Sequence, residues 1–221
     1  MTKMFKNSKH VLAVIMAFAI LAVSMFAGSI VASADSTEAL CAGTRIEYWD
    51  GSKDTALTGS GTEANPYIIT NAAELNYVCT SANAATEDKY YVVDPAIKAF
   101  ILQPQSLVTA LGGADAFMNI KSADETKALF EGADQTKILN WLKNGSSNVF
   151  AGHFDGNGVT ISGLFAYNVG EFVYVGLFPV VEGHTSIKNI TIKNSYISAN
   201  TKDALGALVG ATPYKGDGNS N

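Results

Sequence analysis

The expected fold rests on residues 150–164, which read FAGHFDGNGVTISGL. Short runs of aromatic and β-branched residues flank the tetrapeptide Asp155-Gly156-Asn157-Gly158. Glycine and asparagine tolerate positive φ, and Asp and Asn side chains hydrogen-bond to nearby backbone groups, so the tetrapeptide predicts a turn. A new strand is then expected to begin at Thr160-Ile161.

The tetrapeptide has a second interpretation, in which Asp155 and Asn157 supply oxygen ligands to calcium. The D-x-[DN]-x-[DN]-G spacing of a calcium loop and its closing glutamate are missing, however. We therefore expect a structural turn. By the same reasoning, Asn189 and Asn194 are expected to satisfy backbone groups at strand ends rather than to contact a ligand.

Similar short strands continue from Val149 towards the C-terminus, and parts of them recur. The phrase Gly-Leu-Phe occurs at residues 163–165 and again at residues 176–178. A related phrase, Gly-Ala-Leu-Val-Gly at residues 206–210, begins 30 positions after the second of these. Glycine and asparagine recur at the turn positions between the runs, which is typical of repeated short strands.

A second echo links residues 160–164 to residues 186–190, which begin 26 positions later. A loose period of about 20 to 30 residues, built from short strands and tight turns, is typical of a coiled parallel sheet. We therefore predict a mainly β fold, the start of a right-handed parallel β-helix solenoid. An antiparallel sandwich is the alternative, because it is also made of short strands and turns.

These residues resemble a known family, the secreted bacterial and archaeal adhesin-like β-helix proteins with GLUG-type repeats. The similar segments are residues 150–164, 175–178 and 187–190, which fit the pattern F-x-G-x-F-D-G-N-G-x-x-I-x-G-L … G-L-F … I-x-N-L, and residues 206–210, which resemble the GLUG motif. Such motifs also occur beside immunoglobulin-cleaving metallopeptidases. The resemblance covers about residues 149–210, and residues 49–69 fit the segment that commonly precedes it. It implies a β-helix in a surface protein and little about activity, because the matching residues mostly shape the backbone.

Residues 1–34 have the composition of an export signal. A basic segment at residues 3–9 is followed by a predominantly apolar stretch at residues 11–26 and by Ala32-Ser33-Ala34, which a signal peptidase accepts. We predict that residues 1–34 are a secretory signal peptide and that no membrane insertion persists after cleavage. The alternative is a transmembrane anchor, because residues 11–31 are just long enough to span a bilayer.

Removing the signal leaves 12 basic and 20 acidic side chains in residues 35–221, and hence a net charge of −8. The one arginine is Arg45, and no basic stripe with interleaved aromatic residues is present. An acidic surface of this kind repels phosphate groups, so we expect neither nucleic acid nor anionic lipid as a partner.

The remaining chain is expected to contain three regions. They are an N-terminal α/β cap region at residues 35–103, a helical insertion at residues 104–148, and β-helix rungs with the GLUG-like motif at residues 149–221. Strands are predicted at residues 67–69 and 90–93, and helices at residues 105–111, 123–130 and 134–143. A further helix is expected after Asn71, which caps it together with Glu74 three positions later.

The C-terminal residues 211–221 contain no sorting motif, hydrophobic tail or capping helix. A solenoid whose last rung is open exposes a strand edge and part of its apolar interior. We therefore expect the sequence to be truncated, as a fragment or an early-terminated product of a longer protein.

Cys41 and Cys79 are the two cysteines, and export permits a disulfide between them. The alternative is two free, buried thiols, because two cysteines carry no spacing pattern.

No motif for catalysis, cofactor binding or metal binding is recognisable in the sequence. His153 and His184 lie outside any HExxH zinc motif, and no Gly-x-Ser-x-Gly elbow occurs. The acids of residues 149–210 are Asp155, Glu171, Glu182 and Asp203, and no two occupy alternate positions of one strand. A glycosidase needs two carboxyl groups facing one cleft. We therefore expect no catalytic residues, no cofactor and no metal.

Four aromatic residues near predicted strand ends could stack on sugars: Tyr167, Phe172, Tyr174 and Tyr196. The alternative is that they fill the rungs or cover the edge of the solenoid.

The expected function is that of a secreted or cell-surface, adhesin-like, non-catalytic protein with a glycan or an extracellular protein as its partner. Two alternatives are a carbohydrate-active β-helix enzyme, a polysaccharide lyase or glycosidase, and the non-catalytic flank of a longer secreted peptidase.

Overall fold

A computed structural model describes residues 43–80, 88–134, 136–144, 149–168, 174–199 and 205–212. The chain divides into two units, Met1–Ser36 and Thr37–Asn221, and all described residues belong to the second. The predicted signal peptide therefore lies outside the described residues. Among the residues that the structure does describe, no helix is both long and apolar enough to cross a membrane.

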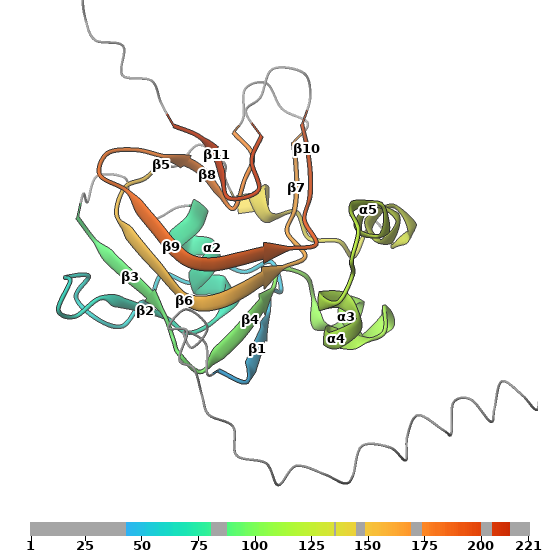
Figure 1. Cartoon of the computed structure of the whole chain (residues 1–221), viewed down its shortest axis with the longest axis horizontal. Coiled ribbons are helices and arrows are strands. Elements are labelled where there is room, and N and C mark those ends of the chain that lie inside the picture. The colour runs from blue at the N-terminus through green and yellow to red at the C-terminus, as the bar shows by residue number, and fades with distance from the viewer. Residues whose placement is uncertain are drawn as a thin grey trace, which may run out of the picture. The chain divides into compact units, whose positions relative to one another are not determined.

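Strands outnumber helices in the described chain (Figure 1). The strands are β1 (Arg45–Tyr48), β2 (Tyr67–Ile69), β3 (Tyr90–Val93), β4 (Ile97–Ile101), β5 (Val149–Phe150), β6 (His153–Ser162), β7 (Phe165–Asn168), β8 (Phe178–Val181), β9 (Ser186–Lys193), β10 (Tyr196–Ala199) and β11 (Val209–Ala211). The helices are α2 (Ala72–Thr80), α3 (Gln105–Ala110), α4 (Gly113–Met118), α5 (Ala123–Gly132) and a 3₁₀ helix (Trp141–Asn144).

Strand β6 organises the largest sheet, whose order is β1-β4-β6-β3-β2 with β9 added beside β6. The first half of β6 pairs with β3 and its second half with β4, while β9 pairs with both halves from the other side. Two smaller stacks contain β7 with β10, and β5 with β8 and β11. Every pair of named strands in the described chain is parallel, and only the isolated bridge between Thr58 and Ile68 is antiparallel. The prediction of a mainly β, parallel fold is confirmed, and the antiparallel sandwich is wrong.

The parallel partners recur at a nearly constant spacing along the chain. His153 pairs with Ser186, Phe165 with Tyr196 and Phe178 with Val209, so the second partner follows the first by 31 to 33 positions. The predicted period is therefore too short. The echo between residues 160–164 and 186–190 is also out of register, because Ser186 aligns with His153 rather than with Thr160. The alignment of the glycine-rich phrases is confirmed, since Val175 bridges Leu205 immediately before them.

The tetrapeptide at residues 155–158 does not end a strand, contrary to the prediction. Strand β6 continues through it, and the register with β9 shifts between Asp155 and Val159 as in a β-bulge. Positive φ occurs at Asn157 (51°) and Gly158 (80°), and in the partner strand at Asn189 (57°). The residues tolerate positive φ as expected, but pairing on both edges of β6 turns their kink into a bend of the strand.

The Asp155 carboxylate holds this bend together. Its Oδ1 accepts hydrogen bonds from the backbone N–H of Asn157 (2.8 Å) and from Nδ2 of Asn189 (2.9 Å), and its Oδ2 lies 3.3 Å from Nζ of Lys188. Partial burial raises the pKa of Asp155, but the hydrogen bonds from Asn189 and Asn157 and the Lys188 charge outweigh burial and lower it. With both oxygens engaged by protein donors, the Asp155 carboxylate stabilises the bend of β6.

Helix α2 lies in the concavity of the curled sheet and packs against β2, β5 and β8 (Figure 1). Its cap is confirmed, because Oδ1 of Asn71 accepts from the backbone N–H of Glu74 at 2.9 Å. The Glu74 carboxylate reaches back to the N–H and hydroxyl of Thr70, one residue further than in a standard capping box. Most of the helix is buried, including Leu75, Val78 and Cys79, so it completes the core of the curled sheet.

Two buried tryptophans extend this core. The rings of Trp49 and Trp141 meet edge to face with centroids 5.0 Å apart. Nε1 of Trp141 donates to the carbonyl of Leu177 at 3.0 Å, and its own carbonyl accepts from Nδ2 of Asn76 at 3.2 Å. These bonds satisfy polar groups that Trp141 and α2 bring into the interior.

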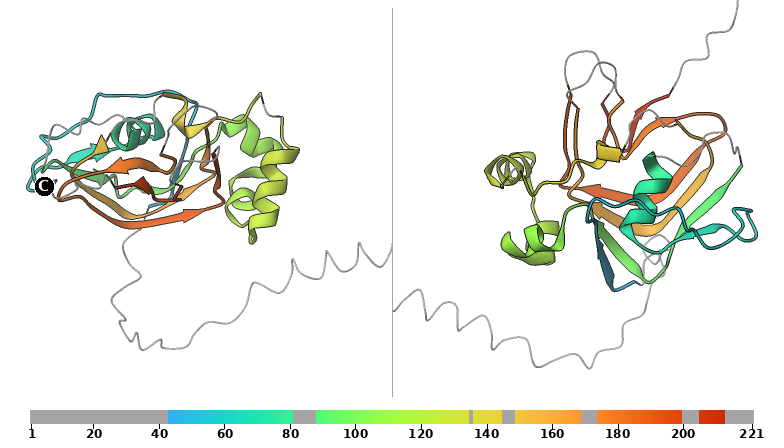
Figure 2. Two further views of the ribbon diagram at one scale, coloured as in Figure 1. Left: turned by 90° about the horizontal axis from the view of Figure 1, so that it is seen from above. Right: turned by 180° about the vertical axis from the view of Figure 1, so that it is seen from behind.

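Helices α3, α4 and α5 are inserted between neighbouring strands β4 and β6 and are grouped beside the sheets (Figure 2). Because of them, β3 and β4 pair with β6 residues 61 to 63 positions later. A second core cluster joins these helices to β4 and contains Ile101, Val108, Phe117 and Phe130. The predicted helices at residues 105–111 and 123–130 correspond to α3 and α5, and the helix α4 was not predicted.

The predicted helix at residues 134–143 is wrong, apart from the 3₁₀ turn that begins at Trp141. Oδ1 of Asp134 accepts from the backbone N–H of Thr136 at 3.0 Å. The fully buried Gln103 binds both backbone groups of Leu139, with its Oε1 accepting from N–H and its Nε2 donating to C=O, each at 3.0 Å. Backbone groups that a helix would need are thus bound by side chains.

A tightly packed glycine at the β6 bend leads to our first prediction. A Cβ on Gly156 would clash with Cγ2 of Ile190 and lie 2.6 Å from the carbonyl oxygen of Asn189. We expect Gly156→Ala to lower the free energy of unfolding by about 1–3 kcal/mol, because overpacking forces the two strands apart.

Gly132→Ala is the matched control, since nothing lies within 4 Å of its Cβ position in α5. It should be neutral or stabilising by up to about 1 kcal/mol. Urea unfolding followed by circular dichroism measures both, and equal effects would contradict the packing argument.

The carboxylate at the same bend leads to a prediction on pH. Since the pKa of Asp155 is lowered from 3.8 by folding, the folded state prefers the carboxylate. Its stabilisation is fully present at neutral pH and is lost as the pH falls through the folded pKa. Asp155→Asn should therefore melt below the wild type at neutral pH, and the difference should shrink below about pH 4.

Thermal unfolding across this range measures the effect of Asp155→Asn. Asp115→Asn on the exposed surface of α4 serves as the control for loss of a carboxylate. A constant difference in melting temperature between the Asp155 variant and the wild type at every pH would contradict the proposed role of the charge.

Candidate functional site

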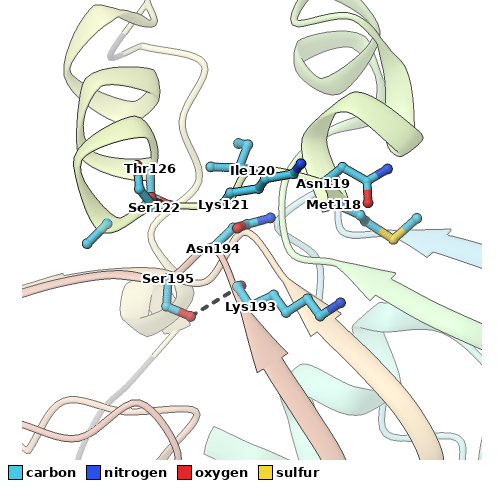
Figure 3. Close-up of a pocket in the computed structure, with 10 residues that line it drawn as sticks. Met118, Asn119, Ile120, Lys121, Ser122, Thr126, Lys193, Asn194 and Ser195 are labelled. Carbon is cyan, nitrogen blue, oxygen red and sulfur yellow. Dashed lines mark hydrogen bonds between the residues drawn. The ribbon is translucent and has the colours of Figure 1, made fainter.

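A groove of about 520 Å³ lies where the end of α4 and the start of α5 meet the junction of β9 and β10 (Figure 3). We call it the helix–strand groove. It is lined by residues 118–123, Thr126 and residues 193–195. The helical insertion and the strands thus contribute one wall each, and neither forms the groove alone.

The helical wall is fixed by the cap of α5. Oγ of Ser122 accepts from the backbone N–H of Glu125 at 3.1 Å, and Oε2 of Glu125 accepts from the N–H of Lys121 at 3.0 Å. This is the arrangement seen at α2, in which the third helical residue reaches the residue before the cap. The backbone of Lys121 is therefore held in place while its side chain is exposed.

The strand wall is fixed by Asn194, which adopts positive φ (50°) between β9 and β10. Its Nδ2 donates to the carbonyl of Phe117 in α4 at 2.6 Å and to Oγ of Ser162 in β6 at 3.2 Å. Asn194 satisfies a backbone group as predicted, but that group is the carbonyl of Phe117 in α4 rather than one at a strand end, so this one side chain links the insertion to the sheet. No sequence pattern indicated that the link borders a groove.

The charge of the groove is positive, although the chain as a whole is acidic. Lys121 and Lys193 are both exposed, and the ten lining residues include no Asp or Glu. Neither lysine forms an ion pair with a described residue. Figure 3 draws both lysine side chains extending along the groove in the same direction. The amide of Asn119 adds both donors and an acceptor, and the hydroxyl of Ser195, which donates to the carbonyl of Lys193 at 3.4 Å, can accept from a ligand.

A second cavity of about 430 Å³, the loop pocket, lies between the segment after β1 and the start of α2. Two carboxylates, Asp50 and Asp54, line it together with Lys53. Hydrogen bonds from the hydroxyl and the N–H of Ser52 lower the pKa of Asp50, and burial lowers the pKa of Lys53. Oδ1 of Asp54 accepts from the N–H of Ala56 at 2.9 Å. Each carboxylate therefore closes its own turn.

His153 lies in a row of side chains that sequence reasoning did not identify. Its Nδ1 is 2.9 Å from Oγ of Ser186, its Nε2 is 3.9 Å from Oδ1 of Asp88, and its ring lies 4.4 Å from that of Tyr90. The order Ser-His-Asp matches a hydrolytic triad. However, Asp88 is beyond hydrogen-bond distance and 77% exposed, and neither cavity described above includes these residues. Tyr90, His153 and Ser186 are direct neighbours across three strands, so the row is a stack on the sheet surface.

The four aromatic residues predicted to stack on sugars do not form a common site among the described residues. Tyr196 is half-buried and stacks on Phe165, with centroids 5.5 Å apart and planes 11° apart. Tyr174 is 45% exposed, and neither ring lines the two cavities. Phe172 and the side chain of Tyr167 lie outside the described residues.

Only one of the two cysteines in the predicted disulfide lies among the described residues. Cys79 is buried in α2 and forms no disulfide with a described residue, and burial raises its pKa. Cys41 lies outside the described residues, so the disulfide stays a prediction. In the part of the chain that the structure covers, no group of three or more His, Cys, Asp or Glu side chains is placed to hold a metal ion.

Comparison with known proteins finds no matching family model and no matching solved structure. A protein named as a Gly-rich membrane protein from Evansella cellulosilytica is 30% identical over 154 residues, which are 69% of this chain and 14% of that protein. Halomucin of Haloquadratum walsbyi is 28% identical over 162 residues, which are 73% of this chain and 1% of that protein. The chain therefore spans only a small part of the length of either curated relative.

Proposed function

We propose that the chain is a secreted or cell-surface, adhesin-like binding protein without catalytic residues, and that its strands begin a right-handed parallel β-helix. The architecture is supported by parallel pairing at intervals of 31 to 33 positions, as expected when each coil lies on the one before it. Right-handed coiling follows from the general preference of parallel crossovers. The surface location is supported by one relative's name as a membrane protein.

The observation that carries the binding role is the helix–strand groove. Its volume of about 520 Å³ falls within the range of small-molecule sites. Asn119, Ser195 and the two lysines present amide, hydroxyl and ammonium groups, which can hydrogen-bond to the hydroxyl-rich surface of a glycan. The hydrogen bonds of Ser122 and Asn194 hold both walls in position before a ligand arrives, which reduces the entropy lost on binding.

One observation favours the alternative of a carbohydrate-active enzyme, namely the two carboxylates of the loop pocket. A glycosidase requires one carboxyl group that retains its proton near neutral pH. The pKa of Asp50 is shifted in the opposite direction, and both carboxylates are engaged in local turns. Binding without chemistry therefore accounts for more of the arrangement.

A binding screen with two sets of variants tests this proposal. The exported chain, residues 35–221, is tested against glycans and extracellular proteins by biolayer interferometry, and sugar release is measured on the same glycans. We expect saturable glycan binding without sugar release. Replacing Asn119 and Ser195 by alanine should weaken binding by about fivefold or more, because each lost hydrogen bond costs about 1 kcal/mol.

The matched control is Asp50→Asn with Asp54→Asn in the loop pocket, which should leave binding unchanged. Sugar release that disappears in this control would establish the enzyme alternative. Failure to bind any glycan or extracellular protein would overturn the proposed function.

A further inference from the structure

We infer that the helix–strand groove recognises an acidic saccharide, whose anionic group is bound by the ammonium groups of Lys121 and Lys193. This inference rests on the proposed binding function and names its ligand class. Its starting point is the local reversal of charge, since the groove is positive in a chain that carries a net charge of −8 after the signal.

The two lysines differ from several others on the surface in lacking an acidic partner among the described residues. Lys127 pairs with Glu131, Lys137 with Asp134, and Lys188 with Asp155. Nearby acids neutralise those three lysines, whereas the groove lysines keep their charge available for a ligand. Such charges also attract an anionic ligand over a distance of about 8–10 Å at moderate salt.

The two charges are brought together by the fold and by specific hydrogen bonds. Lys121 follows α4 and Lys193 ends β9, so the helical insertion and the sheet each supply one. Glu125 fixes the backbone of Lys121, and Asn194 fixes the chain immediately after Lys193. Both lysine stems extend along the groove from these fixed points (Figure 3). Each lysine is thus carried by an anchored element, and both lysines line the same groove.

The remaining lining residues favour a saccharide over a simple anion. Asn119 and Ser195 can hydrogen-bond to sugar hydroxyls, while Met118 and Ile120 offer apolar contact to the C–H groups of a sugar ring. The described residues that line the groove include no aromatic ring, so recognition by charge and hydrogen bonds replaces stacking. The Glu125 carboxylate near Lys121 reduces the net attraction. A free ion is therefore held weakly, and an acidic polymer gains by presenting many copies of the group.

Lysine is a point charge without the planar fork of arginine, so its ammonium group can bind carboxylate and sulfate groups alike. The shared chemistry is an anionic group on a saccharide, and the experiment separates its sources. Binding of residues 35–221 is measured by isothermal titration calorimetry to polygalacturonate, dextran sulfate and neutral dextran, and to acetate and sulfate as free ions.

The variants are Lys121→Gln, Lys193→Gln and their combination. Lys98→Gln is the matched control, because Lys98 is an exposed lysine on β4 that does not line the groove.

Each groove variant should weaken binding of an acidic polysaccharide by about threefold to fivefold, as expected for an exposed charge pair. The double variant should lose about tenfold or more, and added salt should weaken wild-type binding in the same sense. All variants should retain the wild-type melting temperature, since neither groove lysine has an ionic partner among the described residues to lose.

The outcomes distinguish this inference from the function on which it rests. Preference for polygalacturonate identifies the carboxylate as the source of the charge, and preference for dextran sulfate identifies the sulfate. Equal binding of neutral dextran, or full binding by the double variant, would overturn the inference while leaving glycan binding intact. The inference would also fail if Lys98→Gln weakened binding as much as the groove variants. If neither these glycans nor any member of the wider panel binds, the proposed function fails as well.

Discussion

Pairing along both edges of β6 is the constraint on which the rest of the structure depends. The strand is ten residues long and joins β3 and β4 on one side to β9 on the other. Because its side chains alternate between two faces, the register of β6 determines which residues enter the core. Phe154, Val159 and Ile161 are fully buried as a result. The bend at Asp155 lets one strand follow the curve of the sheet without interrupting either set of pairs.

The groove depends on β6 through a short chain of contacts. Ser162, the last residue of β6, accepts from Asn194, and the same amide binds Phe117 at the end of α4. The position of the helical insertion is thus coupled to the register of β6 with β9. Binding residues on two such anchored elements can be presented in a fixed arrangement, whereas the lysine tips remain adjustable.

Much of the secondary structure could be predicted because its signals are local. The cap at Asn71 and the apolar alternation of β9 lie within a few residues of the elements they specify. The errors have long-range causes. Residues 134–140 carry a helical apolar pattern, but Gln103, 36 positions from Leu139, binds their backbone. The kink at Asn157 becomes a bulge only because β9, with Asn189, pairs beside it.

The candidate site was less predictable than the fold for the same reason. Lys121 and Lys193 belong to different regions of the sequence, and no local motif links them. Asn194 was expected to bind backbone groups at a strand end, but the backbone group that it binds is in α4, 77 positions away. Sequence patterns pointed to aromatic residues instead, of which Tyr196 packs against Phe165.

The spacing of the strand partners also favours an order of assembly. Pairing β6 with β3 and β4 joins positions 61 to 63 apart and closes a loop that contains α3, α4, α5 and the 3₁₀ helix. The strands β9, β10 and β11 instead pair across only 31 to 33 positions. The longer closure costs more chain entropy, because more residues lie between the paired strands. Once it is made, each later strand finds a preformed edge in parallel register. The N-terminal part of the curled sheet can therefore act as a template, because the free edge of β6 is ready when β9 forms.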